Sequence, residues 1–88
     1  DVSHANSSKQ HARQITVAAD VAAQIAAGER RITGIMIESH LQEGSQDIVP
    51  GQPLKHGVSV TDACISFSQT VPVLDGLAAA VKARRTLP

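Results

Sequence analysis

The chain has 88 residues, and its eight basic and eight acidic side chains give a formal net charge of zero. Its basic residues form no stripe and Phe67 is its single aromatic residue, which excludes the base stacking and phosphate contacts typical of a nucleic-acid-binding domain. No apolar run approaches the roughly 20 residues of a membrane span, no signal-peptide pattern is present, and Cys64 is the only cysteine. We therefore expect no nucleic-acid partner, no membrane partner, no disulfide and a cytoplasmic location.

The first third of the chain predicts the end of a strand followed by a helix. Residues 1–3 are expected to end a strand, and the side chains of residues 6–8 to accept hydrogen bonds at a helix start. A helix is predicted from about Lys9, with Gly28 as its left-handed cap. Its apolar positions recur at helical spacing, namely Ile15, Ala18, Ala22 and Ile25.

The middle of the chain predicts two strands separated by a long loop. Residues 31–37 form a mostly apolar run with β-branched members, which is typical of a strand buried on both faces. Residues 39–57 are rich in glycine, proline and polar side chains, and loops of such length in compact domains are usually functional. A short strand is predicted over 57–60.

The last segment predicts a second helix over 71–85, with Thr70 as its N-cap and Pro72 in its first turn. We expect its apolar face to consist of Val71, Leu74, Leu77, Ala78 and Val81. The order is thus strand end, helix, strand, long loop, strand, helix. This order is typical of a parallel α/β fold.

One candidate metal ligand follows each predicted strand: His4, Glu38 and Asp62. The carboxyl ends of parallel strands meet at one face of an α/β fold, so these three side chains are expected to converge there. Glu38 ends an apolar run, where an unpaired carboxylate is costly to bury, so it is expected to be paired, protonated or metal-bound.

Each candidate also has a purely structural interpretation. His4 is compatible with a polar loop residue, and Asp62 with the cap of a short helical turn. His40 lies two residues beyond Glu38, where it either extends the site or is exposed on the loop. Cys64 is interpreted as a small buried thiol rather than as a soft ligand. Lys9, near the predicted helix start, either attracts a phosphate group or is an ordinary surface lysine. The other basic side chains considered are expected at the surface, namely His11, His56, Arg84 and Arg85.

Four segments carry a resemblance to a known family: Ser-His-Ala-Asn-Ser-Ser-Lys-Gln at 3–10, Ile-Glu-Ser-His-Leu at 37–41, Ser-Val-Thr-Asp-Ala-Cys-Ile at 59–65, and Ala-Ala-Val-Lys-Ala-Arg-Arg at 79–85. With this spacing they resemble the carboxyl-terminal part of the 3-deoxy-D-arabino-heptulosonate 7-phosphate (DAHP) synthases. The resemblance covers nearly all of the chain.

The resemblance implies a fold and a reaction. The family fold is the (β/α)₈ barrel, so residues 1–88 would be the carboxyl-terminal part of a single barrel domain, comprising its last two to three strand-helix units. In isolation we expect this piece to be incomplete or rearranged. The implied reaction is the condensation of phosphoenolpyruvate with D-erythrose 4-phosphate, the first step of the shikimate pathway to the aromatic amino acids.

The resemblance also implies a metal site. The family is a group of metal-dependent transferases whose divalent ion, Mn, Fe, Co or Zn, is held by a Cys, a His, a Glu and an Asp. His4, Glu38 and Asp62 match the last three of these ligands. The metal-binding Cys of the family lies upstream, and Cys64 does not correspond to it. His40 is a candidate for a proton-handling or outer-sphere role.

Two further expectations concern the chain by itself. The family's upstream phosphate-binding Arg and Lys residues are absent from these 88 residues, so we expect the chain alone to be inactive. Open strand edges and apolar helix faces favour self-association into a homo-oligomer. The alternatives are a non-catalytic, self-associating barrel fragment and a small metal-binding module.

Overall fold

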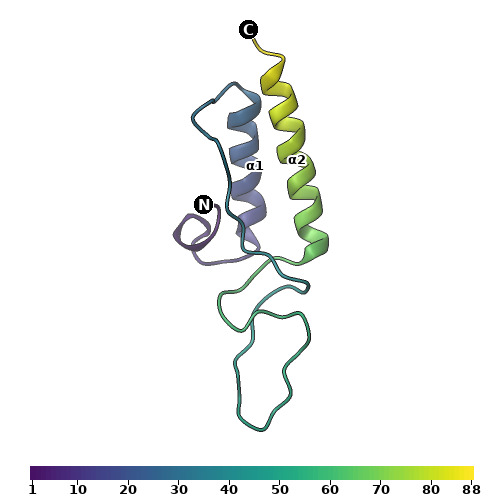
Figure 1. Cartoon of the computed structure of the whole chain (residues 1–88). Coiled ribbons are helices and arrows are strands. Elements are labelled where there is room, and N and C mark those ends of the chain that lie inside the picture. The colour runs from purple at the N-terminus through teal and green to yellow at the C-terminus, as the bar shows by residue number, and fades with distance from the viewer.

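The computed structural model describes residues 1–88 and contains three helical elements: η1 (His4–Ser7), α1 (Arg13–Ala26) and α2 (Phe67–Arg85). Figure 1 shows α1 and α2 side by side and running in the same direction, with the segment after α1 returning beside it. The long connection between residues 39 and 66 extends beyond the amino-terminal ends of both helices (Figure 1). Neither helix has the length and hydropathy that crossing a bilayer requires.

The strands predicted over 31–37 and 57–60 do not form in this structure. Neighbouring extended segments share only isolated β-bridges and form no strand. Two of these bridges are parallel, Ser39–Ile65 and Ser45–Ser59, and one is antiparallel, Gly44–Cys64. Near the amino terminus, Val2 N–H donates to the carbonyl of Met36 at 3.1 Å. A β-ladder needs a neighbouring strand along its whole length, and here each segment has a neighbour at only one or two residues.

α1 begins four residues later than the predicted start at Lys9, because the backbone of the preceding loop cannot be helical. Ser8 and Lys9 have φ angles of 55° and 59°, in the left-handed region. Ser7 does not cap α1 but lies in η1, where its Oγ donates to the carbonyl of His4 at 3.1 Å. The helix start predicted for residues 6–8 is therefore wrong.

The end of α1 matches the prediction. Gly28 has a φ of 113° and follows the last helical turn as a left-handed cap. Its N–H donates to Ile25 O at 3.0 Å, and Glu29 N–H donates to Gln24 O at 3.0 Å. These two bonds make the Schellman arrangement, which satisfies carbonyls that the helix end leaves free.

α2 begins at Phe67, earlier than predicted, because Ser66 rather than Thr70 is its N-cap. Ser66 Oγ accepts from Gln69 N at 3.2 Å, and Gln69 Oε1 accepts from Ser66 N at 2.8 Å. This reciprocal pair is a capping box in which Ser and Gln lie three residues apart. Pro72 consequently lies inside the helix and not in its first turn.

The small core lies between the two helices and the segments that run beside them. Val2, Ala18 and Val73 are buried in its centre, and the partly buried side chains packed around them are Val17, Val21, Ile35, Ile37 and Leu77. The predicted apolar face of α2 is wrong in three positions, since Val71, Leu74 and Ala78 are exposed. The buried residues of α2 are Val73 and Ala80.

The chain encloses few of its own apolar side chains. Only 11 of 88 residues are buried, and the accessible surface of 5945 Å² exceeds the roughly 4,900 Å² expected for a compact protein of this mass. The radius of gyration of 15.4 Å likewise exceeds the expected value of about 12 Å. Large apolar side chains exposed at the surface include Met36, Leu41, Ile48, Leu54, Phe67 and Leu74. This arrangement leaves apolar surface available for further contacts.

Arg84 joins the end of α2 to the turn that follows α1. Its Nη1 donates to Glu29 O at 2.9 Å and to Ile32 O at 3.2 Å. The side chain is therefore not the solvated helix end that the sequence predicts, whereas Arg85 is exposed.

Replacing Arg84 by Met is expected to lower the free energy of unfolding by about 1.5–3 kcal/mol, because hydrogen bonds from a charged donor to carbonyls are lost. Urea unfolding followed by circular dichroism measures this change. Arg85→Met removes the same charge from the same helix turn and is the control, with an expected change near zero. Equal effects of the two substitutions would show that the Arg84 contacts contribute nothing.

Candidate metal centre

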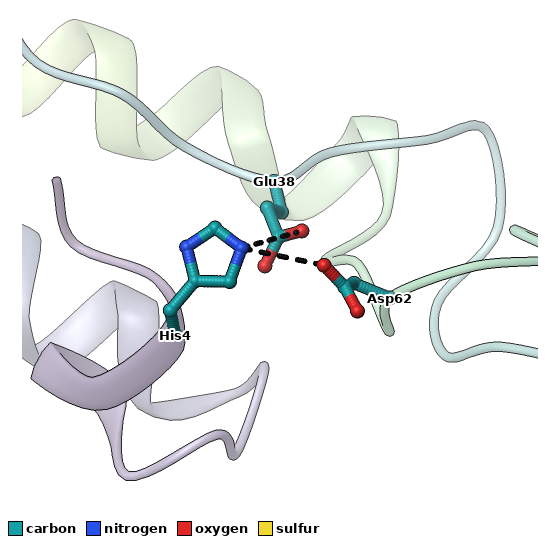
Figure 2. A group of neighbouring side chains, drawn as sticks. All are labelled: His4, Glu38 and Asp62. Carbon is teal, nitrogen blue, oxygen red and sulfur yellow. Dashed lines mark hydrogen bonds and ion pairs between the residues drawn. The ribbon is translucent and has the colours of Figure 1, made fainter.

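The structure brings His4, Glu38 and Asp62 together from three separate segments. Figure 2 shows the imidazole of His4, on η1, facing the carboxylates of Glu38 and Asp62, which lie on two different loops. His4 Nε2 is 3.5 Å from Glu38 Oε2 and 3.3 Å from Asp62 Oδ2. Their convergence agrees with the arrangement expected from the sequence, and their role as ligands remains a prediction.

These distances fit a common cation. One ligand atom from each residue lies within 4.8 Å of the others. Ligand atoms about 2.1 Å from a tetrahedral ion lie about 3.4 Å apart, which matches both distances from His4 Nε2. Two neighbouring carboxylates repel each other, and a divalent ion between them would remove this repulsion. One nitrogen and two oxygen donors suit Mn, Fe, Co or Zn.

The second ring nitrogen of His4 is held on the side away from the carboxylates. Nδ1 lies 2.7 Å from Ser3 Oγ and 3.2 Å from Asp1 Oδ2. The hydroxyl of Ser3 donates to Asp1 Oδ1 at 2.6 Å, so it can only accept from the His4 ring, with the proton on Nδ1. With the proton on Nδ1, the lone pair of Nε2 would be available to a cation placed between His4, Glu38 and Asp62, which is the tautomer that a metal ligand requires.

The backbone of Glu38 is held by a residue that the sequence did not single out. Gln14 on α1 is buried, and its side-chain amide bonds both the N–H and the carbonyl of Glu38, at 2.7 and 3.1 Å. The available signal was a polar residue at helical spacing with the buried positions of α1, four residues before Ala18.

Cys64 is close to this site but lies outside the group of potential ligands. Its thiol is buried, as expected, and donates to Asp62 O at 3.4 Å. Burial raises the pKa of the Cys64 thiol above its usual value, a contact with Ser59 lowers it by less, and the charges of Glu38 and Asp62 add smaller increases. The thiol is therefore protonated near neutral pH and is a poor metal ligand in this state.

A pocket of about 200 Å³ surrounds the three side chains. Lys9 and His11 also line it; Lys9 is exposed, as the sequence predicted. His11 is only partly exposed, and its Nε2 pairs with Glu43 Oε1 at 2.9 Å. The structure does not bring His40 into the group, and its Nδ1 accepts from the neighbouring Leu41 N–H at 2.8 Å.

Comparison with known sequences identifies the family. The profile described as the DAHP synthetase I family matches residues 1–75, which include His4, Glu38 and Asp62. The chain belongs to the DAHP synthetase I family. The resemblance found in the sequence motifs is thereby confirmed.

Curated members of the DAHP synthetase I family match almost the whole chain. The Phe-sensitive phospho-2-dehydro-3-deoxyheptonate aldolase of Escherichia coli K12 is 58% identical over 85 residues, covering 97% of this chain and 24% of the relative. The tyrosine-inhibited phospho-2-dehydro-3-deoxyheptonate aldolase of Schizosaccharomyces pombe is 56% identical over 89 residues, with the same coverage. The chain thus spans about a quarter of the length of these relatives.

A solved structure shares the fold of this part of the DAHP synthetase I family. Phospho-2-dehydro-3-deoxyheptonate aldolase from Francisella tularensis SCHU S4 superimposes with a TM-score of 0.91 at 50% sequence identity. The match covers 97% of this chain and 24% of that chain. The arrangement of η1, α1, α2 and the connecting segments therefore occurs within a larger enzyme of this family.

Proposed function

We propose that residues 1–88 are the carboxyl-terminal part of a DAHP synthase barrel. The intact protein would condense phosphoenolpyruvate with D-erythrose 4-phosphate and water to give DAHP and inorganic phosphate. The observation that carries this proposal is the convergence of His4, Glu38 and Asp62 in one pocket of a chain that belongs to the family.

The three side chains fit a divalent ion in donor type, spacing and charge. Two carboxylates balance the charge of the ion, and His4 adds a nitrogen whose tautomer is set by Ser3 and Asp1. When bound, the ion would act as a Lewis acid toward the aldehyde oxygen of the sugar phosphate. The fourth ligand that the family resemblance implies, an upstream Cys, is not supplied by Cys64.

One other pocket residue, Lys9, suits a phosphorylated substrate. Lys9 lines the pocket beside the two acids, and its ammonium group has the charge that a phosphate oxygen requires. In the reaction, the methylene carbon of phosphoenolpyruvate forms a bond to the aldehyde carbon, the aldehyde oxygen takes a proton, water adds to the adjacent carbon, and phosphate leaves. The pocket would hold the aldehyde end of the sugar phosphate near His4 and Asp62.

The barrel proposal accounts for the missing strands and the exposed apolar side chains. Residues 31–37 have the composition of a buried parallel strand but lack neighbours on which to form a ladder. Exposed apolar residues such as Met36 and Leu74 would be covered by other parts of a complete barrel. We propose a cytoplasmic location for the intact enzyme, with which a chain that holds a single cysteine and no internal disulfide is compatible.

An assay of phosphate release tests the proposed reaction. The intact protein, supplied with Mn²⁺, is expected to release phosphate only when both substrates are present, whereas the 88-residue chain is expected to release none. Without upstream phosphate-binding residues, the chain cannot hold both substrates in the reacting geometry. Turnover by the chain alone would contradict its predicted inactivity, and an intact protein that stays inactive with Mn, Fe, Co and Zn would contradict the function.

The isolated chain is expected to self-associate, because its exposed apolar side chains gain by mutual burial. Light scattering coupled to size-exclusion chromatography is expected to give a mass at least twice the 9.2 kDa of one chain. Leu74→Lys places a charge on the exposed face of α2 and is expected to reduce the association, whereas Thr16→Lys on an exposed polar position of α1 serves as the control. A strictly monomeric chain at high concentration would contradict this prediction.

A further inference from the structure

The side chain of Gln14 makes a two-point contact with the backbone of a proposed metal ligand. Gln14 is 1% exposed, and it is the only buried polar residue of α1. Its Oε1 accepts from Glu38 N at 2.7 Å, and its Nε2 donates to Glu38 O at 3.1 Å. Both polar groups of the Gln14 amide are thus used on one residue, 24 positions away in the chain.

The Gln14 amide takes the place of a missing strand neighbour. At the Ser39–Ile65 bridge, Ile65 N donates to Glu38 O at 3.0 Å and His40 N donates to Ile65 O at 3.0 Å. This bridge leaves the N–H of Glu38 without a backbone partner, and Gln14 accepts its hydrogen bond. The carbonyl of Glu38 receives two donors, one from each side.

These contacts fix the Glu38 backbone at the point from which its carboxylate reaches the pocket. The Glu38 side chain is 20% exposed, and Oε2 lies 3.5 Å from His4 Nε2. Metal ligands must be held close to their productive geometry, and residues that orient a ligand contribute strongly to affinity. An exposed loop without such contacts would not hold a carboxylate in place.

We propose that Gln14 is a positioning residue of the metal centre, acting through the peptide of Glu38. This inference rests on the proposed function, because it assumes that Glu38 binds the metal. Gln14 itself lies outside the group of potential ligands and makes no contact with the ion in this proposal. The alternative is that Gln14 only stabilises the fold.

Metal affinity of the intact synthase separates these two roles. Gln14→Met keeps the length and shape of the side chain but removes both hydrogen bonds. It is expected to weaken Mn²⁺ binding, measured by calorimetry, by about 10–100-fold. Gln24→Met, at an exposed position of the same helix, is expected to leave affinity within about twofold. Arg84→Met is the matched destabilised variant, because its contacts lie away from the pocket.

A second measurement needs no variant. If the Gln14–Glu38 contacts favour metal binding, metal binding must strengthen those contacts by the same factor. Hydrogen exchange of the Glu38 amide is therefore expected to slow about 10-fold or more when Zn²⁺ is added to the wild-type protein. The Ala27 amide, at the far end of α1, is expected to exchange at an unchanged rate.

The outcomes distinguish the inference from the proposed function. If Glu38→Ala weakens Mn²⁺ binding but Gln14→Met does not, or if Arg84→Met weakens it as much as Gln14→Met, the role of Gln14 is overturned and the metal centre stands. An unchanged Glu38 exchange rate in metal-loaded protein also overturns it. If Glu38→Ala leaves binding intact, the metal centre itself is wrong.

Discussion

Replacing Glu38 by Ala is expected to weaken Mn²⁺ binding by the intact protein by more than about 100-fold and to abolish the proposed condensation. Loss of a residue that merely orients a ligand typically costs about 10–100-fold in affinity, so loss of a ligand should cost more. Glu38 is the least exposed of the three candidate ligands, with 20% of its side chain accessible against 48% for His4 and 66% for Asp62. Water can therefore replace its carboxylate less easily than that of Asp62.

The control for this experiment is Asp47→Ala, which removes an acidic side chain from the long loop that follows Glu38, outside the pocket. Calorimetric titration of both variants and of the triple variant His4→Ala, Glu38→Ala, Asp62→Ala would resolve the contribution of the group as a whole. Unchanged Mn²⁺ affinity and turnover in the triple variant would contradict the metal centre. If Glu38→Ala and Asp47→Ala weakened Mn²⁺ binding equally, the loss would be a general effect of removing a negative charge.

Replacing Ile65 by Ala is expected to lower the free energy of unfolding of the chain by about 2–5 kcal/mol. Ile65 is 0% exposed, and its backbone bonds both Glu38 and His40, so the cavity would open beside the site. The loss is large for a chain in which few side chains are buried, because little other packing opposes unfolding. Urea unfolding at low micromolar concentration, where self-association is weakest, measures the change.

Ile48→Ala makes the same chemical change at a position that is 66% exposed, and its expected effect is below about 0.5 kcal/mol. If the two substitutions changed the free energy of unfolding by amounts less than about 1 kcal/mol apart, the prediction would be wrong. Either the residues around Ile65 would have closed the cavity, or they would not be tightly packed. The Glu38 amide is also expected to exchange faster in Ile65→Ala, since Ile65 N–H donates to the carbonyl of Glu38.

Sequence reasoning succeeded where local chemistry determines the structure. Gly28 ends α1 because glycine alone adopts the left-handed cap at little cost, and this requires no knowledge of distant residues. The same local logic failed at the start of α2, since both Ser66 and Thr70 are acceptable caps. Gln69, three residues after Ser66, was the deciding signal, because it completes the capping box.

The errors at strands and helix faces have a common physical cause. The apolar pattern of residues 31–37 indicates that these side chains are buried in the complete fold. The backbone hydrogen bonds of a β-ladder form only where a neighbouring strand is present. In this structure the neighbours are a few backbone groups and one glutamine side chain. Val71 and Leu74 are exposed for the same reason, since nothing within the chain covers that side of α2.

The three residues of the site could be predicted from the sequence, but the hydrogen bonds that hold them in place could not. The positions of His4, Glu38 and Asp62 after apolar or extended segments indicated a shared face, and the structure places them together. The contacts of Ser3 and Gln14 join residues that single-sequence patterns do not pair. Gln46 behaves like Gln14: its amide bonds the backbone of Lys55 and Val58, at distances of 2.8–3.0 Å.

The two ends of the long loop are held together by a backbone hydrogen bond, which matters for attaching labels to the molecule. Gln42 N donates to Gly57 O at 2.8 Å, and a side chain at Gly57 would approach Leu41 Cβ to 2.9 Å, so the two limbs touch there. The turn at Pro50 and Gly51 lies beyond this closure and is exposed. A fluorescent dye or affinity peptide inserted at that turn would leave His4, Glu38 and Asp62 undisturbed, which makes the turn a suitable attachment point for testing metal uptake with a labelled molecule.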